Sequence, residues 1–199
     1  MPSASTAPSF SVCVYCGSRL GAQPVYRELA RALGTAIGRR GWQLVYGGGR
    51  AGLMGEVADA VLSAGGRVVG VIPETLMKME VGHHGLHELH VVQTMHQRKQ
   101  MMAERADAFI AMPGGIGTFE ELFEVWTWRH LAYHDRPMAL LDAAGYWQPM
   151  LDFLRHAVAQ GFMDQGQMAM LLVDSEVERL LDALVARRGD PDDDDFGRI

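Results

Sequence analysis

The sequence has little of the features that mark several other classes of protein. Its 199 residues include two cysteines and two lysines, and no apolar run approaches the ~18 residues that a membrane helix needs. Lysine and arginine number 18 against 24 acidic residues, for a net charge of −6, so no basic surface is expected for nucleic acid. Residues 1–9 carry neither the basic nor the apolar part of a secretory leader. We therefore expect a cytoplasmic protein with no membrane or nucleic-acid partner.

The two cysteines, Cys13 and Cys16, have the C-x-x-C spacing of a redox or metal-binding pair. In redox proteins this motif opens a helix, whereas here it falls in an expected strand. Residues three apart on a strand point to opposite faces of the sheet. We expect both thiols to be structural, with the redox or metal pair as the alternative.

The chain length fits one domain, which we place at residues 10–188. A flexible segment, 1–9, is expected before it. An acidic tail, 189–199, holds five aspartates and one arginine, and this composition predicts a disordered, solvated segment.

Strand patterns and helix patterns alternate along the domain. Most strand segments are rich in Val, Ile or Leu without polar alternation, which is typical of a parallel sheet buried on both faces. The alternation predicts a doubly wound α/β fold, a three-layer sandwich whose parallel sheet has about seven strands. Residues 76–86 fit neither pattern, and we expect a loop over the ligand site there. The expected strands are 11–15, 43–46, 68–72, 89–93, 108–112, 138–141 and 171–173, and the expected helices are 24–39, 52–64, 95–105, 119–131, 146–159 and 177–187.

A glycine-rich turn separates the expected strand 108–112 from the expected helix 119–131. Glycines allow a close approach of the backbone, and amides at a helix N-terminus bind anions. We expect a phosphate here, with Thr118 as a hydroxyl donor. Glu121 follows one turn into the helix, and since a carboxylate would repel a phosphate, we expect it to contact the sugar of a nucleotide. The turn consists of Pro113, Gly114, Gly115, Ile116, Gly117 and Thr118.

Two more turns follow expected strands, at 16–18 and at 47–52, and all three should meet at the carboxyl edge of the sheet. Residues 47–52 match the G-x-G-x-x-G fingerprint of dinucleotide-binding proteins. However, they follow the second strand, and the acidic residue that ends the next strand, Glu74, is badly placed for a ribose, so NAD is only an alternative. Because Gly117 is followed by Thr118 rather than by lysine, the sequence argues against a P-loop ATPase.

Two cations, Arg98 and Lys99, lie early in the expected helix 95–105. Cations oppose the helix dipole there, which suggests an anionic ligand, although simple solvent exposure would also explain them. Met95, Met101 and Met102 could line an apolar pocket for a base, although methionine at helical spacing is more often in the core, and we expect this for Met101 and Met102.

Four histidines between residues 83 and 90 resemble a metal site. Glycines at 82 and 85 argue against a regular helix there, and the H-E-x-x-H motif is absent. We expect a solvated loop and no metal.

Together these motifs resemble the LONELY GUY family. The resemblance covers roughly residues 10–184, and its motifs occur in the family's order and spacing. They are Tyr15-Cys16-Gly17-Ser18, Tyr46-Gly47-Gly48-Gly49 with Gly52-Leu53-Met54-Gly55, Met95-His96-x-Arg98-Lys99-x-x-Met102, and the PGGxGTxxE motif from Pro113 to Glu121.

The resemblance implies a modified Rossmann fold and a phosphoribohydrolase. Such enzymes hydrolyse the N-glycosidic bond of N6-substituted AMP to a free base, a cytokinin, and ribose 5-phosphate, commonly as dimers with sites near the interface and without a cofactor. Glu121 would stabilise the cationic sugar or activate water, and Arg98 would hold the sugar or phosphate, or stabilise the leaving base. The expected substrate-binding residues are Ser18, Gly48, Met95, Arg98, Lys99, Gly114, Gly115, Ile116, Gly117, Thr118 and Glu121.

Three alternatives stay open. The chain could bind nucleotides without turnover, or act mainly on unsubstituted AMP. The family's older label of lysine decarboxylase would require pyridoxal phosphate on a lysine, and Lys78 and Lys99 have no evident partner for that cofactor's ring.

Overall fold

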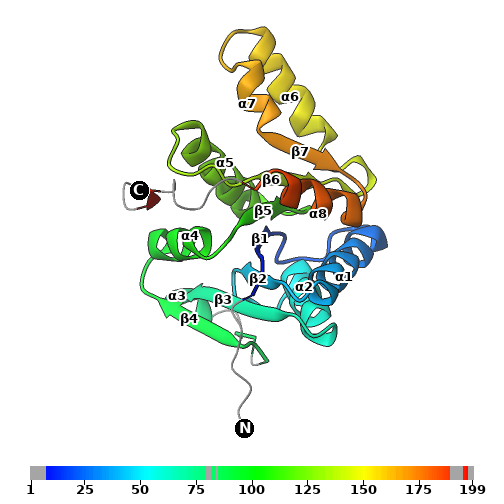
Figure 1. Ribbon diagram of the computed structural model, residues 1–199, viewed down its shortest axis with the longest axis vertical. Helices are drawn as coiled ribbons and strands as arrows, with labels where there is room; N and C mark the ends of the chain where they lie inside the picture. Colours follow the sequence, from blue (N-terminus) through cyan, green and yellow to red (C-terminus); the bar gives the residue numbers. More distant parts are fainter. Residues whose placement is uncertain (1–7, 79–81, 84, 189–194, 197–199) are drawn as a thin grey trace.

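Seven parallel strands form a single sheet at the centre of the protein (Figure 1). The computed structural model describes residues 8–78, 82–83, 85–188 and 195–196. Its strand order, β4-β3-β2-β1-β5-β6-β7, confirms the predicted α/β fold. The strands are β1 (Ser11–Tyr15), β2 (Gln43–Tyr46), β3 (Arg67–Pro73), β4 (Glu88–Val92), β5 (Ala108–Ala111), β6 (Met138–Leu141) and β7 (Leu171–Asp174).

Helices cover both faces of this sheet. Figure 1 shows α1, α2 and α8 on one face and α4 and α5 on the other, with α6 and α7 beyond β7. A separate apolar core fills each face, as predicted for strands buried on both sides. The helices are α1 (Pro24–Arg39), α2 (Gly52–Ser63), α3 (Glu74–Met77), α4 (Met95–Glu104), α5 (Ile116–His130), α6 (Gln148–Ala159), α7 (Gln165–Ala169) and α8 (Val177–Ala186), with a 3-10 turn, η1 (Ala143–Gly145).

Two glycines of α1 set its close approach to α2. A Cβ on Gly34 would lie 2.4 Å from the carbonyl oxygen of Val57, and one on Gly38 would lie 2.7 Å from that of Val61. Neither distance is sterically allowed, so glycine is required at both positions. Leu33 and Ile37, members of the apolar stripe of this helix, are fully buried beside them.

Helix α5 begins at Ile116, three residues before the predicted start. The glycines had suggested a longer loop, but a helix N-terminus that faces a ligand tolerates glycine. Ile116, Gly117 and Thr118 therefore belong to the first helical turn.

The segment 76–86 is only partly a loop. Its first two residues end α3, and Gly82 forms an isolated antiparallel bridge with Gly49. Residues 79–81 and 84 lie outside the described residues, as do residues 1–7 of the N-terminal segment that we expected to be flexible.

Two residues of the acidic tail pack on the body of the protein. The backbone amide of Asp195 donates to the carbonyl of Tyr133 at 2.9 Å. Phe196 is only 7% exposed and stacks on His134, beneath the guanidinium of Arg136. We expected the whole tail to be solvated, whereas the ring of Phe196 packs against other rings and is buried. Residues 189–194 and 197–199 lie outside the described part of the chain.

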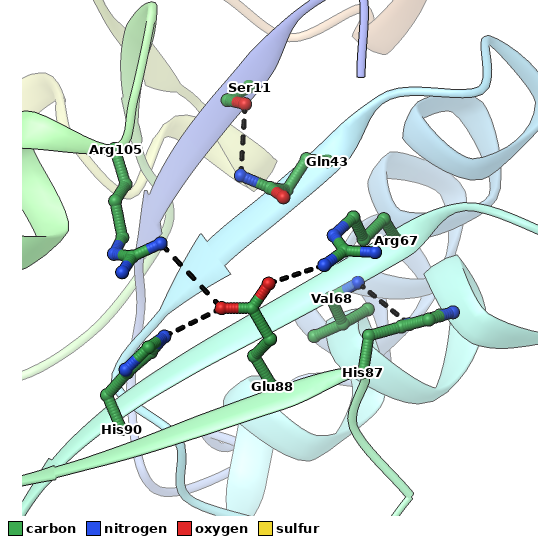
Figure 2. A network of polar contacts seen from close by, with 8 residues as sticks. All are labelled: Ser11, Gln43, Arg67, Val68, His87, Glu88, His90 and Arg105. Carbon is green, nitrogen blue, oxygen red and sulfur yellow. Dashed lines mark hydrogen bonds and ion pairs between the residues drawn. The ribbon is translucent and has the colours of Figure 1, made fainter. Parts of the chain in front are cut away.

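The amino ends of β3 and β4 are joined by an ionic network around Glu88 (Figure 2). Its carboxylate accepts hydrogen bonds from Arg67 and from Nε2 of His90, and Arg105 at the end of α4 lies 3.7 Å away. The bond from Arg67 is the main cause that holds the pKa of Glu88 below its usual range. The network fastens the edge strand β4 at the end of the sheet remote from the glycine-rich turns.

The described histidines between residues 83 and 90, which are His83, His87 and His90, make separate structural contacts. Nε2 of His83 lies 2.8 Å from Asp59. Nδ1 of His87 accepts the backbone N–H of Val68 at 3.2 Å, as Figure 2 shows. His83 is buried, which corrects the expectation of a solvated loop at that position. No group of three or more His, Cys, Asp or Glu side chains among the described residues could hold a metal ion.

Candidate active site

A cavity of about 820 Å³ opens where the strand order reverses. From β1 the chain runs outward to β4, then returns to place β5 on the other side of β1. The chain after β1 and the chain after β5 therefore continue into helices on opposite faces of the sheet, α1 and α5, and leave a crevice between them, which is where open α/β sheets bind ligands. The lining residues are 16–22, Tyr26, Leu53, Met54, Leu76, Met95, Arg98, 113–118, Glu121 and Tyr146.

The N-terminus of α5 supplies free amides to this cavity. No side chain caps the helix at Gly115, and the first amides of any α-helix lack partners within the helix. A Cβ on Gly115 or Gly117 would meet nothing within 4 Å, so both backbones face open space. Gly114 is different, because a Cβ there would lie 2.1 Å from Oγ1 of Thr118. Gly114 thus allows the turn to close, and Gly115 and Gly117 leave room for a ligand.

The three glycine-rich turns converge, as predicted. The amide of Gly17 donates to the carbonyl of Pro113 at 3.0 Å, and the amide of Leu53 donates to the carbonyl of Gly17 at 3.0 Å. Gly52 has a φ of +62°, and a Cβ there would lie 2.3 Å from the backbone of Ser18. The turn after β1 is therefore held between the other two.

Tyr146 connects a fourth segment to the glycine-rich turn at 113–118. Its hydroxyl donates to the carbonyl of Gly114, and its ring packs edge-on against Tyr26 at 5.9 Å. Both rings line the cavity. Sequence reasoning missed these tyrosines, because each is a single residue far from any motif.

Arg98 and Glu121 form a buried ion pair in the cavity. Nη1 of Arg98 lies 3.4 Å from Oε1 of Glu121, and each residue is only 9% exposed. The guanidinium also donates from Nε to the carbonyl of Val71 at 3.1 Å and from Nη2 to that of Gly47 at 3.4 Å. A Cβ on Gly47 would lie 2.0 Å from Nη2, so glycine at this position makes space for the arginine.

Burial raises the pKa of Glu121 to about 7, although the positive charge of Arg98 works in the opposite direction. Desolvation destabilises a carboxylate more than the neutral acid. The carboxylate therefore gains stability when a positive charge forms beside it. A group of this kind in a cleft is a candidate for catalysis.

Nine of the eleven expected substrate-binding residues line the cavity. Gly48 lies outside the lining, with a φ of +74°, where a Cβ would lie 3.2 Å from that of Ile72. Lys99 also lies outside, because its ammonium pairs with Glu120 and with Glu124, the latter at 2.9 Å. The anion that we expected beside Lys99 is thus a pair of carboxylates of α5. Those within the lining are Ser18, Met95, Arg98, Gly114, Gly115, Ile116, Gly117, Thr118 and Glu121.

The two cysteines are free and buried, and burial raises the pKa of both thiols well above the usual range. Cys13 belongs to the core between β1 and the helices of one face. Cys16 lies in the core of the other face and also lines the cavity. The opposite faces agree with the strand geometry.

The helices in the described part of the chain are too short or too polar to cross a bilayer.

The chain is similar to proteins with one recurring name. Residues 54–184 match the family described as possible lysine decarboxylase. A cytokinin riboside 5'-monophosphate phosphoribohydrolase of Rhodococcoides fascians is 49% identical over 175 residues, or 87% of this chain and 88% of that protein. The enzyme of the same name, LOG1, from Arabidopsis thaliana is 49% identical over 152 residues, or 76% of this chain and 71% of that protein.

Solved structures share the fold at lower identity. The molybdenum cofactor binding protein of Rippkaea orientalis superposes with a TM-score of 0.68 at 19% identity, over 92% of this chain and 98% of that one. The molybdenum cofactor carrier protein of Chlamydomonas reinhardtii also gives 0.68, at 21% identity, over 88% and 98%. At these identities the likeness shows the architecture alone.

The similarity to the named phosphoribohydrolases extends over most of this chain. The family match at residues 54–184 includes Arg98, the turn at 113–118 and Glu121 of the cavity. The chain belongs to the LONELY GUY family of phosphoribohydrolases, whose members also carry the older description of possible lysine decarboxylases.

Proposed function

We propose that this protein hydrolyses the N-glycosidic bond of N6-substituted adenosine 5'-monophosphates, releasing the free base and ribose 5-phosphate. The observation that carries the proposal is the buried Glu121–Arg98 pair beside the uncapped start of α5, in one cavity. A binding site for the 5'-phosphate and a desolvated carboxylate near the sugar are two features suited to cleavage of a nucleotide at its sugar. The names of the similar proteins support the same reaction.

The 5'-phosphate is assigned to the turn at 113–118. The amides of Gly115, Gly117 and their neighbours, the hydroxyl of Thr118 and the positive end of the α5 dipole favour an anion there. Ser18 lies on the adjoining loop and adds a hydroxyl. With the phosphate fixed at the helix N-terminus, the ribose lies toward Glu121, farther along the same helix.

Glu121 and Arg98 are assigned different roles at the sugar. As the bond from C1' to the base nitrogen breaks, positive charge develops on the ribose, and the carboxylate of Glu121 stabilises it. Water then adds its hydroxyl to C1', and the proton that the water loses is transferred to the base nitrogen released from C1', so the base leaves as a neutral molecule. Arg98 stays protonated, so its role is to orient Glu121 and to donate hydrogen bonds to the substrate rather than to give up a proton.

The apolar part of the lining is assigned to the base and its N6 substituent. Leu53, Met54, Leu76 and Met95 contribute to it, and Met95 is part-exposed at the start of α4. Apolar and flexible side chains favour an alkenyl group over the polar amine of plain AMP. No residue of the lining is assigned to a cofactor or a metal.

The active form is proposed to be a homodimer in the cytoplasm. Helices α4 and α5 expose Met95, Ile116 and Phe123, and Ile116 is 84% exposed at the mouth of the site. Such apolar side chains on one layer are suited to contact with a second copy. The cytoplasm is the compartment of phosphorylated nucleosides and of free thiols such as Cys13. Sedimentation at micromolar concentration should give twice the mass of 21.9 kDa, and a monomer would contradict the dimer.

The direct test is product identification. The purified protein is incubated with N6-isopentenyladenosine 5'-monophosphate or with AMP, and chromatography with mass detection follows the free base and ribose 5-phosphate. We expect both products in equal amounts, faster from the isopentenyl nucleotide. Binding without products would make this a nucleotide-binding module, and faster cleavage of AMP would make it an AMP nucleosidase.

A further inference from the structure

The cavity has a deficit of positive charge for the ligand that it is proposed to hold. Among the residues that the structure describes, its lining contains three charged side chains, those of Arg19, Arg98 and Glu121. Arg98 lies 3.4 Å from Glu121, so these two charges largely cancel when the carboxylate is ionised. A phosphomonoester carries about −1.5 to −2 at pH 7, and a helix N-terminus supplies only about +0.5.

The other cations near the start of α4 and α5 are already engaged. Arg98 uses Nε and Nη2 for the carbonyls of Val71 and Gly47 in addition to its contact with Glu121. Lys99 lies outside the cavity lining and pairs with Glu120 and Glu124. To turn toward a phosphate, Arg98 would have to give up buried hydrogen bonds to two carbonyls, and Lys99 would have to leave its two carboxylates. The loss of a buried hydrogen bond is costly.

Arg19 is in the opposite situation. Its side chain is exposed and, within the described residues, makes no hydrogen bond or ion pair, yet it borders the cavity. Its backbone is fixed next to the phosphate turn, because Gly17 donates to the carbonyl of Pro113 at 3.0 Å and Gly52 packs against the backbone amide of Arg19. A long side chain therefore starts from a rigid base at the rim of the anion site.

We infer that Arg19 is a phosphate-binding residue of this site, whose guanidinium closes on the 5'-phosphate and supplies the charge that the helix N-terminus lacks. The inference rests on the proposed function for the identity of the ligand. A guanidinium presents two parallel N–H groups to a phosphate and remains protonated at any working pH. Arg19 thus favours nucleoside monophosphates over nucleosides, and its contribution falls with salt because the side chain is exposed.

The test compares Arg19→Gln and Arg19→Lys with the wild type. Arg50→Gln is the matched control, since Arg50 is also exposed and without an ion pair in the described residues, on the turn after β2, but does not line the cavity. kcat/KM is measured for N6-isopentenyladenosine 5'-monophosphate and for its nucleoside at several ionic strengths. The Kd of ribose 5-phosphate is measured by calorimetry as a readout that needs no turnover.

For Arg19→Gln we expect kcat/KM on the nucleotide to fall about 10- to 100-fold, with a similar loss in the binding of ribose 5-phosphate, as for one charge-assisted contact. The nucleoside value should be unchanged, the salt dependence should flatten, and Arg19→Lys should recover part of the loss, while Arg50→Gln should match the wild type. The inference would be overturned if Arg19→Gln kept the wild-type ratio of kcat/KM for the nucleotide to kcat/KM for the nucleoside, whether both values stayed the same or both fell equally. A wild type that binds ribose 5-phosphate but releases no base would instead refute the proposed hydrolysis, and the calorimetry would still decide the role of Arg19.

Discussion

Glu121→Gln should lower kcat for nucleotide hydrolysis by at least ~10²-fold, because removing charge stabilisation at a reacting centre commonly costs ~10²–10³ in rate. The glutamine keeps the shape of the side chain and loses only the negative charge that faces the developing sugar cation. Single-turnover measurements with N6-isopentenyladenosine 5'-monophosphate would give the rate of the chemical step. A variant that keeps more than half of the wild-type rate would exclude Glu121 as the stabilising carboxylate.

The same substitution should make the fold more stable at neutral and higher pH. Burial raises the pKa of Glu121 from 4.5 to about 7, so ionisation of this group opposes folding. Its favourable contribution is complete below pH 4.5 and is lost as the pH rises through 7. Glutamine resembles the neutral acid at every pH, and with ~1.4 kcal/mol per pKa unit the gain at pH 8 is up to about 3 kcal/mol. Urea unfolding of the wild type and of Glu121→Gln at pH 5 and at pH 8 measures this gain in the free energy of unfolding. An equal gain at both pH values would contradict the ionisation of Glu121 as its cause.

The activity of the wild type should follow the same ionisation. Because the carboxylate is the form that stabilises the cation, kcat should rise with pH through about 7. kcat is the appropriate quantity, since the substrate's phosphate has its own pKa near ~6 and affects binding. A kcat that falls above pH 7 would mean that Glu121 acts as a proton donor instead.

Arg98→Ala is expected to lower kcat/KM at least ~10²-fold, and Arg98→Lys should not restore it. The guanidinium joins the carbonyls of Val71 and Gly47 to Glu121 through three different nitrogens. An ammonium is a point charge at the end of a flexible four-carbon stem and cannot hold all three in place. Equal kinetics for lysine and arginine at this position would show that charge alone matters.

The pH profile of kcat separates two roles of Arg98, the effect of its charge on the pKa of Glu121 and the positioning of Glu121 by its guanidinium. Its positive charge lowers the pKa of Glu121, so Arg98→Ala should move the rise in kcat to a higher pH than in the wild type. In Arg98→Lys, the pH at which kcat rises should stay closer to that of the wild type, while the maximum value of kcat stays low. Circular dichroism melting curves of both variants would establish that they remain folded.

The sequence predicted the sheet and the place of the site, because these follow from strong local patterns. Buried strands rich in Val, Ile and Leu specify parallel pairing, and glycine turns after such strands must lie at one edge. The start of α5 was predicted three residues late, because Gly117 indicates a loop in the sequence, whereas the helix begins before it, at Ile116.

Residues without a motif could not be predicted in the same way. Tyr146 and Tyr26 reach the site through contacts between distant segments, which one sequence does not encode locally. The position of Lys99 outside the cavity lining could have been predicted, because adjacent helical residues point ~100° apart and Arg98 and Lys99 therefore face different neighbours. Glu120 and Glu124, four residues apart on α5, form the complementary surface for Lys99.

The requirement for the 5'-phosphate tests the proposed reaction most directly. The phosphate is remote from the bond that breaks, so its binding energy orients the sugar and should affect turnover as well as affinity. Two charge-assisted hydrogen bonds of ~1.5 kcal/mol each already correspond to ~10²-fold. We expect kcat/KM for N6-isopentenyladenosine 5'-monophosphate to exceed that for the nucleoside by at least this factor, with ribose 5-phosphate as a product. Comparable values for the two substrates would place the phosphate outside the cavity and contradict the assignment of residues 113–121.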